Sequence, residues 1–328
     1  MERLLFSTLL LSVAAAPTLA VDASPYPQVR LQNEQLRLQV HLPDPERGAY
    51  RATRFDHAGL IHSLRYQGVE YFGPWQDGPH DPYAHGAVNG PVESFSPLGL
   101  EEGASYVKIG IGVIAHPEGP YRFRDTHEIL DAGDWQVRQG EDWITMEQSV
   151  QQPRFASKEG SYSGGFGYRY RKTVRLTEQG FVLERQLENT GLRGMDTEMF
   201  NHNFFALAST ELGTAWVDAQ YQLQLAFEPQ VEKAEPRLAL EGKQVQLLQA
   251  ISNEQRLFVP LAGHAGVADH QFTVHHTGLN RGISVQGSLP LSKLVLWAND
   301  KAISPENFVR IQLAAGESLS WHNEYRVY

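Results

Sequence analysis

The stretch Glu198-Met199-Phe200-Asn201-His202-Asn203-Phe204-Phe205-Ala206-Leu207 sets three consecutive polar side chains inside an apolar run. An unpaired polar group in a protein interior costs roughly 1–3 kcal/mol, so a buried strand does not carry three of them without partners. Either Asn201, His202 and Asn203 satisfy one another, or they line a cleft in which a polar ligand satisfies them. A lone histidine in such a place is most often structural, so the choice depends on a second chemical group.

That second group stands in a distant apolar segment, Ile303-Ser304-Pro305-Glu306-Asn307-Phe308, just before the C-terminal strand. The segment supplies one carboxylate, Glu306. A histidine and a glutamate that converge from distant strands can form a general acid–base pair. We therefore predict that His202 and Glu306 are catalytic.

Short segments of alternating apolar and polar residues dominate the chain and are typical of half-buried strands. Glycines (29) and prolines (18) separate them as turns, and no amphipathic helix of convincing length appears. Many short strands with regular turns favour an all-β sandwich or barrel. The clearest predicted strands cover residues 29–32, 36–40, 106–113, 168–176, 181–187, 308–313 and 319–328.

The N-terminus has the pattern of a secretory signal peptide. Arg3 precedes an apolar run from Leu4 to about Ala16, and Ala16-Pro17-Thr18-Leu19-Ala20 carries small residues where a signal peptidase reads them. We expect residues 1–20 to be cleaved after Ala20 and the protein to be periplasmic or secreted. No later stretch is long and apolar enough for a membrane span.

The composition limits the remaining possibilities. The chain has no cysteine, which excludes disulfides, thiol catalysis and cysteine-ligated metal. Its net charge of −10 and scattered Lys and Arg residues argue against a nucleic-acid partner. We expect residues 21–328 to form a single β-sandwich domain, and the sequence does not decide the oligomeric state.

The longest irregular stretch runs from about Phe72 to Leu100 and is rich in Gly, Pro, His and Asp. Irregular loops of this length inside compact domains are usually functional. We interpret this one as a wall of the binding cleft.

The sequence resembles the galactose mutarotase (aldose 1-epimerase) superfamily. The phrase at 201–207 is similar to that family's Asn-His-Ser-Tyr-Phe-Asn-Leu signature, and the run-up Leu187-Glu188-Asn189-Thr190-Gly191 is similar too. A glutamate followed by Leu313-Ala314-Ala315-Gly316-Glu317 and a closing strand that ends in an aromatic residue also matches. His85-Gly86, followed by Gly90-Pro91-Val92-Glu93-Ser94-Phe95, resembles the family's His-Gly-Gly loop.

The resemblance implies a large antiparallel β-sandwich, the galactose mutarotase-like supersandwich, with a sugar on one concave face. His202 matches the family's catalytic acid and Glu306 its catalytic base. Pro305 stands where the family usually has an apolar residue, and the expected export differs from the cytoplasmic location of the typical mutarotase.

The implied chemistry is the interconversion of sugar anomers. A base removes the proton of the anomeric hydroxyl while an acid protonates the ring oxygen, and the two groups exchange roles when the ring closes. A histidine titrates near neutrality, and partial burial can raise a glutamate towards it. No cofactor is needed.

Three further residues are candidates for substrate binding, each with an ordinary alternative. Arg54 could hydrogen-bond sugar hydroxyls, or pair with Asp56 or another nearby carboxylate. His85 could line the cleft or sit in a solvated loop. Trp297 could offer an apolar platform to a sugar face or simply pack in the core.

Other chemistries find less support in the sequence. Neither His80-Asp81 with His85 nor His275-His276 has the spacing of a zinc motif, so we predict no metal. No Gly-x-Ser-x-Gly elbow appears, and 160–165 reads as a flexible turn.

Three functions remain open. The first is an exported aldose 1-epimerase-like isomerase. The second is a non-catalytic carbohydrate-binding protein, in which Glu306 merely accepts hydrogen bonds from hydroxyls. A polysaccharide lyase on the same fold ranks last, because no helical half is present. In each case the expected partner is a sugar or glycan.

Overall fold

The computed structural model describes residues 24–101, 105–151, 165–207, 216–252 and 254–328. Within these ranges the chain forms strands β1 to β22 and one 3-10 helix, Val267–Asp269, and no α-helix. The prediction of an all-β fold is confirmed. The predicted signal peptide, 1–20, and most of the predicted turn at 160–165 lie outside the described residues.

The strands form four antiparallel sheets. The first has the order β1 (Gln28–Gln32), β2 (Leu36–His41), β3 (Leu60–Tyr66), β4 (Val69–Glu70), and a small one joins β6 (Ser105–Lys108), β7 (Gly112–Ala115) and β8 (Ile129–Asp131). A five-stranded sheet has the order β17 (Leu257–Pro260), β20 (Lys293–Ala298), β21 (Ile303–Leu313), β13 (Met195–His202), β5 (Val92–Phe95). A ten-stranded sheet has the order β15 (Leu238–Glu241), β16 (Gln244–Leu247), β14 (Tyr221–Leu225), β18 (Gln271–His276), β19 (Arg281–Gly287), β22 (Ser318–Val327), β12 (Gly180–Asn189), β11 (Tyr168–Thr177), β10 (Trp143–Val150), β9 (Asp134–Gln139).

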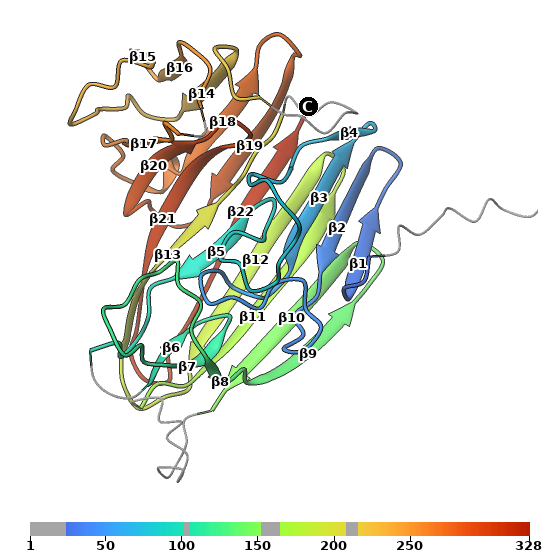
Figure 1. Cartoon of the computed structure of the whole chain (residues 1–328), viewed down its shortest axis with the longest axis vertical. Helices are drawn as coiled ribbons and strands as arrows, with labels where there is room; N and C mark the ends of the chain where they lie inside the picture. Colours follow the sequence, from blue (N-terminus) through green and yellow to red (C-terminus); the bar gives the residue numbers. More distant parts are fainter. Residues whose placement is uncertain (1–23, 102–104, 152–164, 208–215, 253) are drawn as a thin grey trace, which may run out of the picture.

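The core lies where the sheets face one another. Apolar residues of the five-stranded sheet, such as Met199 and Ile311, belong to the same buried cluster as Leu183 and Tyr325 of the ten-stranded sheet. The N-terminal sheet adds residues such as Leu38 to that cluster. Figure 1 shows the N-terminal strands, in blue, at one side of the molecule and the orange strands of β14 to β20 at the opposite end.

Alternation along the strands produces this burial. In β10 buried residues alternate with half-buried ones along the whole strand, as expected for side chains that point to opposite faces at a period of two. In the part of the chain that the structure describes, no helix is both long and apolar enough to cross a membrane.

The prediction of one strand over 106–113 was wrong. The structure has two strands, β6 and β7, joined by a tight turn in which the Ile111 N–H donates to the Lys108 carbonyl at 3.1 Å. Gly110 (φ 81°) and Gly112 (φ 131°) occupy backbone conformations that side chains disfavour. Because both positions are glycine, the chain can reverse direction between β6 and β7. The alternating pattern of the sequence does not indicate this turn.

The predicted irregular stretch at 72–100 is only partly irregular. It contains β5, whose residues pair with β13 from Phe95 opposite Met199 to Val92 opposite His202. Earlier in the stretch, the carbonyl of Trp75 accepts a hydrogen bond from Asn299 Nδ2 at 2.8 Å. The stretch is therefore anchored to the five-stranded sheet beside His202.

Candidate active site

Strand β13 divides the polar triplet between two environments. Asn201, His202 and Asn203 are all at most 1% exposed. Successive side chains of a strand point to opposite faces, so Asn201 turns towards the ten-stranded sheet and His202 away from it. The first alternative, mutual satisfaction by protein groups, therefore holds for Asn201 and Asn203, and the second stays a prediction for His202.

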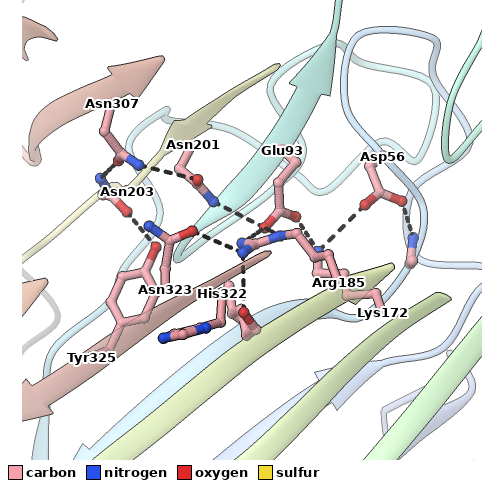
Figure 2. Close-up of polar contacts among 12 residues, drawn as sticks. Asp56, Glu93, Lys172, Arg185, Asn201, Asn203, Asn307, His322, Asn323 and Tyr325 are labelled. Carbon is pink, nitrogen blue, oxygen red and sulfur yellow. Dashed lines mark hydrogen bonds and ion pairs between the residues drawn. The ribbon is translucent and has the colours of Figure 1, made fainter. Parts of the chain in front are cut away.

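The face that carries Asn201 contacts a buried ionic network (Figure 2). Asn201 Nδ2 donates to Glu93 Oε1 at 2.9 Å, and Arg185 Nε donates to the same oxygen at 3.1 Å. Lys172 binds the other Glu93 oxygen and lies 3.4 Å from Asp56 Oδ2. Burial alone would raise the pKa of Glu93, but Lys172 and Arg185 outweigh it and hold that pKa below its ordinary value.

The network continues through amides that join the two large sheets. Asn203 Nδ2 donates to the Pro305 carbonyl at 2.6 Å and to Asn307 Oδ1 at 3.2 Å, and Asn203 Oδ1 accepts the Tyr325 hydroxyl at 3.0 Å. Asn307 Nδ2 donates to Asn201 Oδ1 at 3.3 Å. These contacts fix β13 against β21 and β22, and thereby fix the residue between the two asparagines.

The opposite face of β13 brings His202 to Glu306. His202 Nε2 lies 3.0 Å from Glu306 Oε1, and the two side chains are 2% and 6% exposed. Glu306 stands on β21, the neighbour of β13, one position before Asn307 and therefore on the other face. The other ring nitrogen of His202, Nδ1, is buried without a hydrogen-bond partner in the described part of the chain.

Aromatic rings surround the histidine. Its ring is stacked on Phe204, with centroids 3.6 Å apart, and it meets Trp297 edge to face at 4.7 Å. Phe204 is in turn stacked on Trp75, with ring centroids 5.0 Å apart. The indole Nε1 of Trp75 is buried and has no partner among the described residues. The site thus combines apolar ring faces with buried polar atoms that lack a hydrogen-bond partner in the described part of the chain.

Backbone strain marks the same place. Phe204 has a φ of 46°, in the left-handed region that a bulky residue rarely adopts. Such conformations cost of order 1–3 kcal/mol and persist where the surrounding structure enforces them, often at functional sites. Here the turn lays the Phe204 ring on His202.

Burial shifts the titration of both members of the pair towards their neutral forms. It raises the pKa of Glu306 to about 7, against an opposing effect of Arg54 and Lys293. It also lowers the pKa of His202 well below its ordinary value, and Arg54 lowers it further. Below about pH 7 the pair therefore holds one proton, which burial favours on the carboxyl group rather than the imidazole.

Arg54 lies close enough to act on both members of the pair. Its guanidinium covers the Phe55 ring at 4.4 Å, and its Nε is buried without a partner in the described ranges. The expected alternative, an ion pair with Asp56, does not form, because Asp56 contacts Lys172 and Tyr170 instead. Burial lowers the pKa of Arg54 to about 10.

The other two predicted binding residues border the same site. Trp297 is 8% exposed and packs with Trp75 and Phe204 in one cluster, so it is both a core residue and a neighbour of His202. His85 is half-buried, with its ring 6.4 Å from that of Trp75. The structure thus gathers His202, Glu306, Arg54, His85 and Trp297 around one place.

Sequence reasoning missed several residues of this site. Trp75 lies in the irregular stretch at 72–100, and Arg124 and Arg256 lie in loops, where no periodicity indicates what a side chain faces. A tryptophan within a Gly- and Pro-rich loop was the one available signal. Among the described residues no group of three or more His, Cys, Asp or Glu is placed to hold a metal ion.

Comparison with known proteins bears on the fold. No family model and no curated protein sequence matches the chain. Among solved structures, a galactose mutarotase-like protein from Lactobacillus casei is similar over 92% of this chain and 100% of its own, with a TM-score of 0.54 and 14% identity. A galactose mutarotase related enzyme from Lactobacillus acidophilus is similar over 92% of this chain and 97% of its own, with a TM-score of 0.53 and 12% identity.

An aldose epimerase homologue from C. elegans is similar over 92% of this chain and 99% of its own, with a TM-score of 0.53 and 11% identity. At these identities the likeness shows the fold. The chain is a large antiparallel β-sandwich of the galactose mutarotase-like type, as its sequence predicted.

Proposed function

We propose, from the premise of a galactose mutarotase-like fold, that the protein is an aldose 1-epimerase-type isomerase that interconverts sugar anomers. The contact between His202 and Glu306, 3.0 Å apart in a buried aromatic site, is the observation that supports this most strongly. A fold hosts many functions, so the proposal depends on the pair and not on the likeness alone.

The pair can carry out both proton transfers of ring opening. One group takes the proton of the anomeric hydroxyl and the other protonates the ring oxygen, after which the C1–C2 bond rotates and the steps reverse. We assign Glu306 as base and His202 as acid. This assignment requires an ionised Glu306 and a protonated His202, so the pair carries one proton. The free site carries the same number of protons when Glu306 is protonated and His202 is neutral.

Hydrogen bonds from a bound sugar can favour transfer of this proton from Glu306 to His202. Its hydroxyls would hydrogen-bond to Glu306 and lower the cost of ionising that carboxyl group, while His202 Nδ1 and Arg54 Nε offer polar atoms that lack partners in the described structure. The ring of Trp297, beside His202, offers an apolar face to the C–H side of the sugar. No other reactant is required.

We also propose that the protein acts outside the cytoplasm, as a periplasmic or secreted protein. The support is the N-terminal pattern of Arg3, the apolar run that follows it and the small residues up to Ala20.

The test is proton NMR of freshly dissolved α-glucose and α-galactose, which follows the approach to anomeric equilibrium. The wild-type protein should accelerate it, and His202→Ala and Glu306→Gln should each lose the acceleration by 10²-fold or more, on the order expected for an acid or a base. His322→Ala, at an exposed position of β22, is the control and should keep the wild-type rate.

Full activity of Glu306→Gln would overturn the assignment. Sugar binding without acceleration by the wild-type protein would instead make this a carbohydrate-binding protein, in which the carboxylate only accepts hydrogen bonds.

A further inference from the structure

Three arginines from separate loops converge on the candidate active site. Arg54 and Arg124 lie on one aromatic ring, with their guanidinium carbons 5.2 and 5.3 Å from the centroid of Phe123. Arg256 lies 5.7 Å from the ring centroid of Trp75, which belongs to the aromatic cluster around His202. Arg54 is buried, whereas Arg124 and Arg256 are exposed at the rim.

None of the three forms an ion pair with a carboxylate of the described residues, although the chain carries a net charge of −10. Other arginines of the described ranges do have such partners: Arg47, Arg65, Arg169, Arg171, Arg175, Arg185, Arg237, Arg310 and Arg326. Other described arginines, such as Arg30, Arg138 and Arg281, also lack such a partner. Arg54, Arg124 and Arg256 differ in that they stand together beside the candidate active site, where all three act on His85.

The charges of the three arginines act on His85, which borders the candidate active site. Burial lowers the pKa of His85, and Arg54, Arg124 and Arg256 lower it further, while Asp125 opposes them with a smaller effect. Three cations that repel one another cost free energy unless an anion joins them. A buried guanidinium with an unpartnered Nε, such as that of Arg54, carries an additional desolvation cost.

We propose that the substrate is a sugar that bears an anionic group, a carboxylate, sulfate or phosphate, which Arg54, Arg124 and Arg256 bind. The planar fork of a guanidinium pairs with two oxygens of such a group, and three such groups beside one site suit a single anion. This inference rests on the proposed function, because it assigns the part of the substrate that does not react to the rim beside His202 and Glu306. Neutral glucose would leave the rim cations unpaired.

The test compares anomer interconversion of four sugars by NMR at low ionic strength: glucose, glucuronate, glucose 6-sulfate and glucose 6-phosphate. We expect kcat/KM for at least one anionic sugar to exceed that for glucose by tenfold or more. The preferred member identifies which anionic group the site accepts. Raising the NaCl concentration to about 0.2 M should reduce the preference, because salt screens the exposed Arg124 and Arg256.

The variants Arg124→Gln and Arg256→Gln test the rim directly. Each should lower the ratio of anionic to neutral kcat/KM several-fold, and the double variant should bring that ratio close to one. Arg138→Gln is the matched control: it removes the same charge from an exposed arginine on β9, at the far edge of the ten-stranded sheet, and should leave the ratio unchanged.

The outcomes separate the two proposals. If glucose is interconverted as fast as every anionic sugar, the epimerase stands and the anionic substrate is wrong. If no sugar is accelerated, calorimetric titration of the wild-type protein with the same four sugars decides. Selective binding of an anionic one that is lost in the double variant keeps this inference and rejects the epimerase, and no such selectivity rejects both.

Discussion

Asn201 and His202 are neighbours on β13 that face opposite sides of its sheet, Asn201 hydrogen-bonded to Glu93 at 2.9 Å and His202 in contact with Glu306 at 3.0 Å. One strand therefore connects a buried ionic network with the candidate catalytic pair. The network holds the backbone, and the backbone places the imidazole. Adjacent residues of β13 thus contact the ionic network and the candidate catalytic pair, respectively.

The first prediction concerns the network itself. Glu93→Gln should destabilise the protein by about 3–5 kcal/mol, because it leaves Lys172 and Arg185 buried without their shared counter-charge. Glu147→Gln, which removes the partner of the half-exposed Arg171, should cost about 0–1 kcal/mol. Urea unfolding measures both, and an equal cost for the two variants would contradict the role assigned to Glu93.

The second prediction is the pH dependence of catalysis. The active pair carries one proton, and burial places the loss of that proton from Glu306 at a pKa of about 7. The value of kcat/KM, which reports the free enzyme, should therefore fall as pH rises above 7 and approach a tenfold loss per pH unit by about pH 8–9. Below pH 7 it should stay high, because the pKa of His202 lies well below its ordinary value.

Initial-rate NMR with subtraction of the spontaneous reaction gives this profile. A kcat/KM that rises through pH 7 would instead show that the ionised Glu306 works without a proton on His202.

The third prediction links Glu306 to stability. Its pKa is raised in the folded protein, to about 7 from an ordinary 4.5, so its contribution to stability is fully present below pH 4.5 and is lost as pH rises through 7. Glu306→Gln removes that loss. The variant should therefore gain stability relative to the wild type between pH 5 and pH 8, by on the order of 2–3 kcal/mol.

Unfolding by urea at the two pH values checks this difference. A constant difference between variant and wild type would show that the carboxyl group of Glu306 is not shifted by burial.

The fourth prediction concerns the stack beneath the histidine. Phe204→Leu keeps an apolar side chain but removes the ring that lies 3.6 Å from the His202 ring, so the imidazole should lose its fixed orientation. We expect a loss of about tenfold or more in kcat with the protein still folded, since misplacement of a reacting group is costly in rate. Phe258→Leu, at a position that is 61% exposed on β17, is the control for the same exchange and should be neutral.

Much of the architecture could be predicted, because alternation reports which face of a strand is buried. The segments at 168–176 and 181–187 became the centre of β11 and β12. The prediction of one strand over 106–113 was wrong because Gly110 and Gly112 reverse the chain without interrupting the alternating pattern. Glycine conformations depend on what packs around them, which a single sequence does not state.

The site was harder to predict than the sheets. The proximity of His202 and Glu306 was expected from two distant apolar segments that each carry one of these residues and from the family resemblance, and the structure places the two side chains in contact. The rim arginines Arg124 and Arg256 were missed because loop residues have no period that indicates their direction. The partner of Asn201 was missed for another reason: Glu93 is a charged residue with no exposed surface, and its burial depends on two cations far away in the sequence.

The alternation of Asn201, His202 and Asn203 also limits how this chain can diverge. Insertion or deletion of one residue within β13 would exchange the two faces, sending the imidazole into the ionic network and an amide towards Glu306. The loops that carry Trp75, Arg124 and Arg256 can change length and thereby change which substrate is bound, whereas β13 can change only by substitution. Descendants of this sequence should therefore vary in what they bind long before they vary in the spacing of this strand.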